Sequence, residues 1–243
     1  MNSCMHIAVV LAGGKGSRMK SSIPKQYIML NDRPVLYYSL KAMEDSFIDA
    51  VVLVCGAQEE EYCQKELIDR YGLKKVVSVV CGGRERYDSV YNGLKEIYRL
   101  GIADNNAYVY IHDGARPCID GELLEECRAS VEKYGACVPA VPVKDTIKIV
   151  DGEGFSAGTL KRSTLMAVQT PQCFELDKIY RAYSAMSAAA SDGNDISDIT
   201  DDAMVAERFA DVRVKLCMGS YHNIKVTTPE DITTAGELIE LHE

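Results

Sequence analysis

The sequence predicts an α/β fold in which helices flank a mainly parallel sheet. Short apolar runs with the length of buried strands recur along the first part of the chain: His6–Leu11, Ala50–Cys55, Val76–Cys81, Ala107–His112 and Ala136–Val141. Longer segments between them carry apolar residues at three- and four-residue spacing: Val35–Met43, Glu59–Tyr71, Ser89–Leu100 and Gly121–Tyr134. This alternation is typical of parallel strands joined by helical crossovers.

A protruding β-arm is predicted at residues 144–169, where the alternation stops. Thr146–Val150 is a candidate strand, Asp151–Gly154 a turn and Thr159–Gln169 a returning segment. A two-stranded ribbon with little core of its own is only marginally stable. We therefore expect the arm to pack on a second subunit and form a homodimer.

The last third of the chain continues the α/β pattern without a linker or a repeat. The elements expected there are a helix at Leu176–Ala190, a polar stretch at Ser191–Ile199, a helix from about Asp201, a strand at Val212–Met218 and a helix at Pro229–Leu241. Thr228 before Pro229 supplies a capping hydroxyl, so capping explains the start of the last helix. The sequence predicts a single domain over residues 1–243, with the arm inside it.

Composition limits the range of partners and compartments. The chain has 243 residues, of which 47% are hydrophobic, and this is enough to bury a substantial core. Its formal net charge of −9 opposes nonspecific nucleic-acid binding, which depends on cations that neutralise phosphates. No apolar run approaches the ~20 residues of a membrane span, and no secretory leader precedes the first strand. We expect a cytoplasmic protein that binds neither nucleic acid nor membrane.

The cysteines and histidines do not form a pattern typical of zinc sites. The nine cysteines include no C-x-x-C pair, and the four histidines are scattered. Reduced thiols in or near the core fit this pattern best. A metal ion, if one binds, should be held by oxygen ligands.

A glycine-rich loop follows the first predicted strand. In Leu11-Ala-Gly-Gly-Lys-Gly-Ser-Arg-Met19, small residues let backbone amides approach a phosphate chain, and Lys15 and Arg18 add positive charge. The loop lacks the residue order of a P-loop, and Met19 stands where the dinucleotide fingerprint has its last glycine or alanine. ATPase and dehydrogenase functions are therefore disfavoured, while a tight turn without a ligand stays an alternative.

Further candidate residues follow other predicted strands. Gly82 and Gly83 come after the third strand, with Ser89 at the next helix, and Asp113 ends the fourth strand. Ligands of open α/β sheets bind at the carboxyl ends of the strands. Asp113 is a candidate ligand for Mg²⁺ beside a triphosphate, with a salt bridge to Arg116 as the alternative. The neighbouring His112 is expected to be a packed strand residue.

Four cations complete the candidate site. Lys25 follows Pro24, Arg162 lies on the return of the arm, and Lys225 lies near the carboxyl terminus. With Arg18, they would supply the positive charge that a triphosphate and a second phosphate require in an acidic protein.

Seven motifs occur in one order along the chain: Leu11–Met19, Pro24-Lys-Gln26, Gly82-Gly83 with Arg86 and Ser89, His112-Asp-Gly-Ala-Arg-Pro117, Asp145-Thr-Ile-Lys148, Gln169-Thr-Pro-Gln172 and Asn223-Ile-Lys-Val-Thr-Thr-Pro-Glu-Asp231. In these motifs the chain resembles the 2-C-methyl-D-erythritol 4-phosphate cytidylyltransferases over nearly its whole length. The resemblance implies a Rossmann-like nucleotidyltransferase fold and a homodimer joined by the β-arms. It also implies transfer of a cytidylyl group from CTP to 2-C-methyl-D-erythritol 4-phosphate in the non-mevalonate route to isoprenoid precursors, giving 4-diphosphocytidyl-2-C-methyl-D-erythritol and pyrophosphate.

The resemblance also implies roles for individual residues. Arg18 and Lys25 would stabilise the transition state, while Arg162 and Lys225 would position the acceptor phosphate. The residues expected to hold CTP are Ala12, Gly13, Gly14, Gly16, Gly83, Ser89 and Asp113, with Asp113 also on Mg²⁺. The residues expected to contact the acceptor are Arg116, Thr146, Arg162, Thr200 and Lys225, in part from the partner subunit.

Three alternative functions remain open at this point. Ala12-Gly13 stands where the family commonly has two alanines, and glycine is also seen there in ribitol 5-phosphate cytidylyltransferases, so ribitol 5-phosphate is the alternative acceptor. An NAD-dependent oxidoreductase is disfavoured by the missing last glycine. A noncatalytic nucleotide-binding protein would leave the four cations without a purpose.

Overall fold

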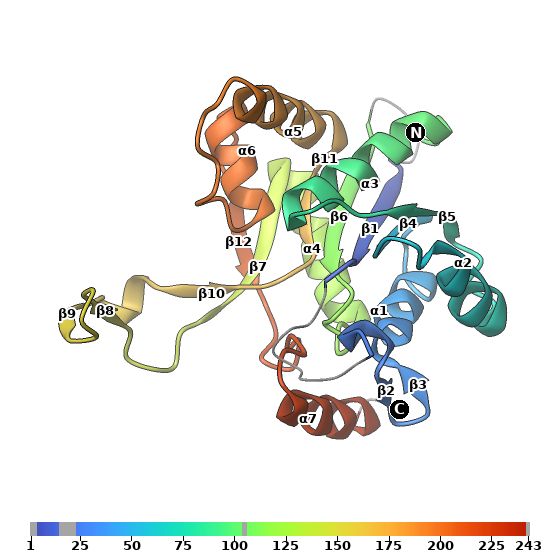
Figure 1. Cartoon of the computed structure of the whole chain (residues 1–243), viewed down its shortest axis with the longest axis horizontal. Coiled ribbons are helices and arrows are strands. Elements are labelled where there is room, and N and C mark those ends of the chain that lie inside the picture. Colours follow the sequence, from blue (N-terminus) through green and yellow to red (C-terminus); the bar gives the residue numbers. More distant parts are fainter. Residues whose placement is uncertain (1–3, 15–22, 104–105, 242–243) are drawn as a thin grey trace.

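The computed structural model of this protein describes residues 4–14, 23–103 and 106–241, and it is built around an eight-stranded sheet (Figure 1). The strand order is β10-β7-β11-β6-β1-β4-β5, and β12 pairs with β7. The strands are β1 (His6–Ala12), β4 (Ala50–Cys55), β5 (Val76–Cys81), β6 (Tyr108–Asp113), β7 (Ala136–Pro142), β10 (Met166–Val168), β11 (Gln172–Glu175) and β12 (Lys215–Met218). Among the described residues, no helix is long and apolar enough to cross a membrane.

The centre of the sheet is parallel, as predicted. Strands β5, β4, β1 and β6 run in one direction, with Val9 of β1 paired to Val52 of β4 and to Ile111 of β6. Because parallel strands are covered on both faces, β1 and β4 are apolar and buried almost throughout. Their carboxyl ends all meet at one edge of the sheet.

Helices cover both faces of the sheet. They are α1 (Val35–Glu44), α2 (Glu60–Tyr62) continuing into η3 (Cys63–Asp69), α3 (Arg86–Leu100), α4 (Gly121–Tyr134), α5 (Leu176–Ser191) and α6 (Asp202–Ala210). The last helix, α7 (Pro229–Glu240), packs instead in a separate apolar cluster with Leu30 and Val35. Alternate residues of β1 point to opposite faces. Ala8 and Val10 pack in the core with α1, η3 and α4, while Ile7 and Val9 pack in the core with α3, α5 and α6.

Two predicted helices differ in detail from the structure. The helix expected at Glu59–Tyr71 is wound as a π-helix over Cys63–Asp69. Helix α3 begins at Arg86 rather than Ser89, because Glu85 and Asp88 form a reciprocal capping box ahead of the apolar stripe. The capping predicted at Thr228 is confirmed: its side chain and that of Asp231 accept hydrogen bonds from each other's backbone N–H.

Strand β11 was not predicted. It runs antiparallel between β6 and β7, with Cys173 paired to Tyr110 on one side and to Cys137 on the other. Its four residues are too few to show a period, so only the pairing to two neighbours defines it.

The last strand is also shorter than predicted: β12 begins at Lys215 and not at Val212. All nine cysteines are free thiols, and seven of them are buried.

The arm projects from the body of the molecule, as Figure 1 shows. Strands β8 (Lys148–Val150) and β9 (Ser156–Thr159) form its antiparallel hairpin. The returning segment predicted at Thr159–Gln169 divides into three parts in the structure: the hairpin partner β9 ends at Thr159, a 3-10 turn η4 (Arg162–Thr164) follows, and β10 joins the main sheet. Strand β10 pairs with residues 140–142 of β7, and this gives it backbone partners that the thin hairpin lacks.

Candidate active site

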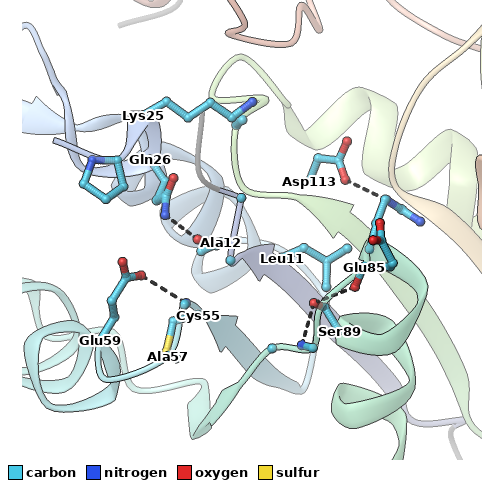
Figure 2. Close-up of a pocket in the computed structure, with 18 of the residues that line it drawn as sticks. Leu11, Ala12, Lys25, Gln26, Cys55, Ala57, Glu59, Glu85, Ser89 and Asp113 are labelled. Atoms are coloured by element: carbon cyan, nitrogen blue, oxygen red, sulfur yellow. Dashed lines mark hydrogen bonds and ion pairs between the residues drawn. The ribbon is translucent and has the colours of Figure 1, made fainter. Parts of the chain in front are cut away.

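A cleft lies at the carboxyl ends of the four central parallel strands, with a volume of about 1050 Å³ (Figure 2). The residues that line it include Ala12 at the end of β1, Gly56 after β4, Gly82 after β5 and Asp113 at the end of β6. Open α/β sheets bind their ligands at this edge, and the sequence predicted that the candidate residues would gather there. The cleft is large enough for a nucleotide.

The described start of the first glycine loop lies beside a short helix that carries Lys25. Helix η2 (Lys25–Tyr27) is held against the loop, because the side-chain amide of the buried Gln26 donates a hydrogen bond of 2.5 Å to the carbonyl of Ala12. Gly13 and Gly14 line the cleft next to this contact. Gly16 and Arg18, both expected in the site, lie outside the described residues.

The second glycine turn is closed by Ser89. The backbone N–H of Gly83 donates to Ser89 Oγ at 3.0 Å, and the hydroxyl of Ser89 donates to the carbonyl of Glu85 at 3.2 Å. A Cβ atom on Gly83 would lie only 2.1 Å from Cβ of Asp88. The turn therefore accepts no side chain at Gly83, and backbone rather than side-chain atoms form this wall of the cleft.

Asp113 is a nearly buried carboxylate held by two cations. Lys225 Nζ lies 2.6 Å from Asp113 Oδ2, and Arg86 Nε lies 3.3 Å from Asp113 Oδ1. Burial alone would raise the pKa of Asp113, but the charges of Arg86 and Lys225 outweigh it and lower that pKa well below its usual range. Asp113 is therefore ionised at neutral pH.

Arg86 is also held by a second carboxylate, that of Asp202. Its two terminal nitrogens donate to the two oxygens of Asp202 at 2.9 and 2.7 Å. Asp202 is completely buried and also accepts a hydrogen bond of 2.5 Å from the hydroxyl of Tyr183. Burial would lower the pKa of Arg86, but Asp202 and Asp113 raise it well above its usual value, so the guanidinium stays charged.

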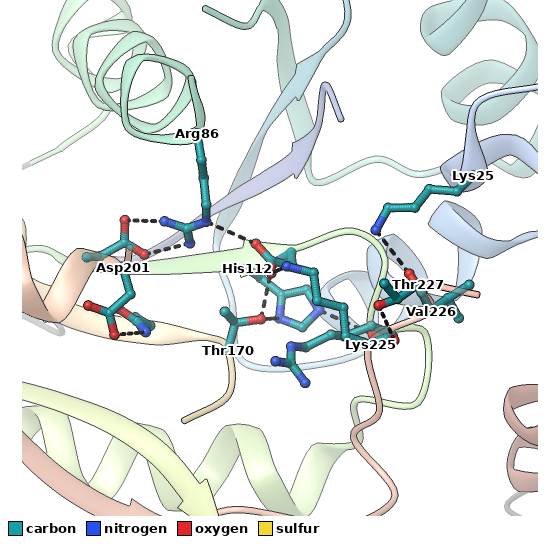
Figure 3. Close-up of polar contacts among 12 residues, drawn as sticks. Lys25, Arg86, His112, Thr170, Asp201, Lys225, Val226 and Thr227 are labelled. Carbon is teal, nitrogen blue, oxygen red and sulfur yellow. Dashed lines mark hydrogen bonds and ion pairs between the residues drawn. The ribbon is translucent and has the colours of Figure 1, made fainter. Parts of the chain in front are cut away.

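Lys25 and Lys225 approach the cleft from opposite ends of the chain. Lys25 Nζ donates a hydrogen bond of 3.0 Å to the carbonyl of Val226, the residue after Lys225 (Figure 3). Both lysines line the cleft together with Arg86. Arg84 lines the cleft as well, and in a chain with a net charge of −9 four cations at one cleft mark a site for a strongly anionic ligand.

A comparison with known protein families assigns this chain to a family. Residues 6–240 match the family described as IspD: 2-C-methyl-D-erythritol 4-phosphate cytidylyltransferase. The chain belongs to this family. The predicted family and the predicted class of enzyme, a cytidylyltransferase, are both confirmed.

Related proteins of this family match the chain over nearly its full length. The 2-C-methyl-D-erythritol 4-phosphate cytidylyltransferase of Lachnospira eligens is 46% identical over 233 residues, which cover 96% of this chain and 98% of that protein. The enzyme of the same name from Clostridium kluyveri is 44% identical over 237 residues, with 97% of each chain covered.

Solved structures confirm the predicted nucleotidyltransferase fold. The 4-diphosphocytidyl-2C-methyl-D-erythritol synthase of Anaerococcus prevotii superposes with a TM-score of 0.78 at 31% identity, covering 98% of this chain and 96% of that one. Another crystal structure of a 4-diphosphocytidyl-2C-methyl-D-erythritol synthase gives a TM-score of 0.79 at 27% identity, covering 98% and 99%.

Several residues expected in the site do not line the cleft of their own chain. Thr146 and Arg162 are exposed on the arm, where Arg162 Nη1 donates to the carbonyl of Lys144 at 2.9 Å. Thr200 is exposed just before α6, and its hydroxyl lies 3.2 Å from the sulfur of Met204. Arg116 donates to the carbonyl of Asn223 at 2.7 Å instead of pairing with Asp113. Of the residues expected to contact the acceptor, Lys225 alone lines this cleft, among the described residues.

His112 is a packed strand residue, as expected. It is fully buried, and its Nδ1 accepts from the hydroxyl of Thr170, which itself accepts from the backbone N–H of Asp113. Its Nε2 therefore carries the proton and donates to the carbonyl of Arg116 at 3.3 Å. Burial lowers the pKa of His112 to about 4, so the ring is neutral at physiological pH.

Sequence reasoning missed the roles of Arg86 and Asp202. Arg86 belongs to the second glycine motif, but nothing local distinguishes it from a solvated helix residue. Asp202 lies 116 positions further along the chain, so no sequence spacing could pair the two. A signal was present only in the acidic start of α6, where Asp201 is the N-cap and explains the local pattern by itself.

Proposed function

We propose that this family member transfers the cytidylyl group of CTP to 2-C-methyl-D-erythritol 4-phosphate within the cleft described above. The observation that supports this most strongly is the convergence of Lys25, Arg86 and Lys225 on a cleft walled by two glycine turns. Backbone turns accommodate a phosphate chain closely, and the cations balance its charge.

The proposed chemistry needs no protein nucleophile. An oxygen of the acceptor phosphate attacks the α-phosphorus of CTP, the bond from that phosphorus to the bridging oxygen breaks, and pyrophosphate leaves. The second pKa of a phosphate monoester is ~6, so the attacking group is already largely a dianion at neutral pH. Catalysis then rests on positioning and on charge stabilisation, for which Lys25 and Arg18 are the proposed groups.

The nucleotide would be held mainly by backbone atoms. Ala12, Gly13 and Gly14 present one turn to the cleft, and Gly83 presents the other with Ser89 fixing its shape. Gly16 is proposed to bind CTP as well. A phosphate chain needs such closely approaching N–H groups, and a larger residue at Gly83 would collide with Asp88.

Mg²⁺ is proposed as the metal, with Asp113 as its protein ligand. Within residues 4–14, 23–103 and 106–241, no three His, Cys, Asp or Glu side chains are arranged to hold a metal on their own. Mg²⁺ is commonly bound by one or two carboxylates together with substrate phosphates, so a lone ionised Asp113 beside a triphosphate fits it. The ion would neutralise developing charge on the phosphates.

The acceptor site is proposed to form between two subunits, because Thr146 and Arg162 lie on the projecting arm. The hairpin exposes apolar side chains, including Phe155, which is 68% exposed, Val150 and Ile149. An isolated monomer gains nothing from such exposure, whereas a second copy would bury it. We propose a homodimer of single-domain chains joined through residues 144–169, with Arg116, Thr200 and Lys225 completing each site.

The test is pyrophosphate release from CTP and Mg²⁺, with 2-C-methyl-D-erythritol 4-phosphate and ribitol 5-phosphate offered separately. Faster turnover of 2-C-methyl-D-erythritol 4-phosphate supports the proposal. Preference for ribitol 5-phosphate would change the acceptor and keep the mechanism. No release with either acceptor would overturn the proposed function.

A further inference from the structure

Arg86 forms ion pairs with both Asp202 and Asp113, and the function proposed so far gives no role to Asp202. We infer that Asp202, acting through Arg86, is a positioning residue that holds the Asp113 carboxylate ready for the metal-bound nucleotide. The inference rests on the proposed role of Asp113.

The geometry links three elements into one chain of contacts. Asp202 is the first residue of α6, Arg86 is the first residue of α3, and Asp113 is the last residue of β6. Asp202 occupies both terminal nitrogens of Arg86, so the plane of the guanidinium is fixed. The third nitrogen of the guanidinium, Nε, donates to Asp113 Oδ1 at 3.3 Å.

The pair is built to stay in place. Asp202 is fully buried, and the hydroxyl of Tyr183 occupies the same oxygen that accepts from Arg86 Nη1. Removing one partner of a buried pair leaves an uncompensated charge, so neither side chain can swing away without a large cost. Arg86 is therefore a fixed support for Asp113 and not a mobile counter-ion.

The other cation on Asp113 is held differently. The side chain of Lys225 is 40% exposed, whereas that of Arg86 is 29% exposed and held by two carboxylates. A lysine on a flexible stem can release a carboxylate more readily than an arginine fixed by two parallel hydrogen bonds. The arrangement therefore restrains Oδ1 of Asp113 and leaves Oδ2 for exchange between Lys225 and a metal ion.

The experiment measures CTP binding by calorimetry over a range of Mg²⁺ concentrations, without acceptor, for the wild type, Asp202→Asn and Arg86→Lys. We expect both variants to need on the order of 10- to 100-fold more Mg²⁺ for half-maximal CTP binding, as found for residues that orient metal ligands. Arg86→Lys keeps the positive charge but loses the planar guanidinium that forms two parallel hydrogen bonds. The charge alone should therefore not restore wild-type Mg²⁺ dependence. Urea unfolding of each variant reports stability separately.

Glu96→Gln is the matched control. Glu96 is another buried carboxylate on α3, paired with Arg99 at 2.6 Å, and it does not line the cleft. We expect this control to lose stability without any change in Mg²⁺ dependence. Should Asp202→Asn fail to fold, Tyr183→Phe removes only one hydrogen bond to Asp202 and should shift the Mg²⁺ dependence in the same direction by a smaller factor.

An Asp202→Asn or Tyr183→Phe variant that loses stability as Glu96→Gln does, but keeps the wild-type Mg²⁺ dependence, would overturn the inference. Absence of Mg²⁺-dependent CTP binding in the wild type would overturn the metal role of Asp113 and the inference with it. Failure of turnover with either acceptor, with the Mg²⁺ shift intact, would count against the proposed function alone.

Discussion

The ammonium group of Lys225 lies 2.6 Å from Oδ2 of Asp113, across 112 positions of sequence. The sequence assigned the two residues to different ligands, Asp113 to the metal and Lys225 to the acceptor phosphate. In the structure they form an ion pair within one cleft. If Asp113 holds the metal as proposed, binding of the metal-bound nucleotide would compete with this ion pair.

Replacing Lys225 by Gln should separate these two roles. We expect kcat/KM for the acceptor to fall on the order of 10²-fold, because a charged contact to the acceptor phosphate is lost. The Mg²⁺ concentration for half-maximal CTP binding should fall, because the lysine no longer competes for Oδ2. Steady-state kinetics and calorimetry measure both quantities. A higher Mg²⁺ requirement would mean that Lys225 supports the metal site instead of competing with it.

Loss of the Lys25 charge should affect turnover more than ground-state binding. For Lys25→Met we expect kcat to fall on the order of 10²-fold or more, because its charge is proposed to act on the transition state. Single-turnover measurement of pyrophosphate formation tests this. Lys133→Met, at the end of α4 and outside the cleft, should keep the wild-type rate. Equal rates for the two variants would remove Lys25 from the catalytic set.

The second glycine turn should not tolerate a methyl group at Gly83. A Cβ there would overlap Cβ of Asp88, so Gly83→Ala must shift the turn or the start of α3. Overpacking of this kind costs roughly 1–3 kcal/mol, and CTP affinity should fall as well. Urea unfolding and calorimetry check the two effects. Gly121→Ala, where nothing lies within 4 Å of the added atom, is the control and should leave both quantities close to wild type.

Burial of neutral His112 should make the protein less stable in mild acid. Its pKa is about 4 in the folded chain and 6.5 without the burial, so the unfolded chain binds more protons between these values. Stability from this residue is therefore complete above pH 6.5 and falls as the pH drops towards 4, by about 3 kcal/mol. Urea unfolding of the wild type and of His112→Gln at several pH values tests this. Parallel pH curves for the two proteins would contradict it.

Mixing two inactive variants tests whether the arm completes the partner's site. Arg162→Gln damages the arm and Lys25→Met damages the cleft, so in a mixed dimer one site would carry both damaged groups and the other neither. An equal mixture that exchanges subunits should recover about a quarter of wild-type activity, as expected for a two-fold symmetric dimer. No recovery despite exchange would place both residues in the site of the same chain.

Local sequence determined much of this fold. The apolar runs and the helical spacing fixed the parallel centre of the sheet and the helices on its faces, because burial on both sides leaves a periodic trace in the chain. The sequence also predicted the cap at Thr228 and the glycine turns, since each depends on residues only a few positions apart. Resemblance of the ordered motifs pointed to the family, which the comparison confirmed.

Tertiary structure alone decided the contacts that organise the cleft. Strand β11 exists because β6 and β7 offer it partners on both sides, and β10 leaves the arm to pair with residues 140–142 of β7. The pairs Lys225–Asp113 and Arg86–Asp202 join residues more than 100 positions apart. Backbone periodicity says which face of an element is buried, but not which charged side chains meet where elements converge. Which charged side chains meet depends on the order of strands in the sheet, and this order is complete only when the whole chain has folded.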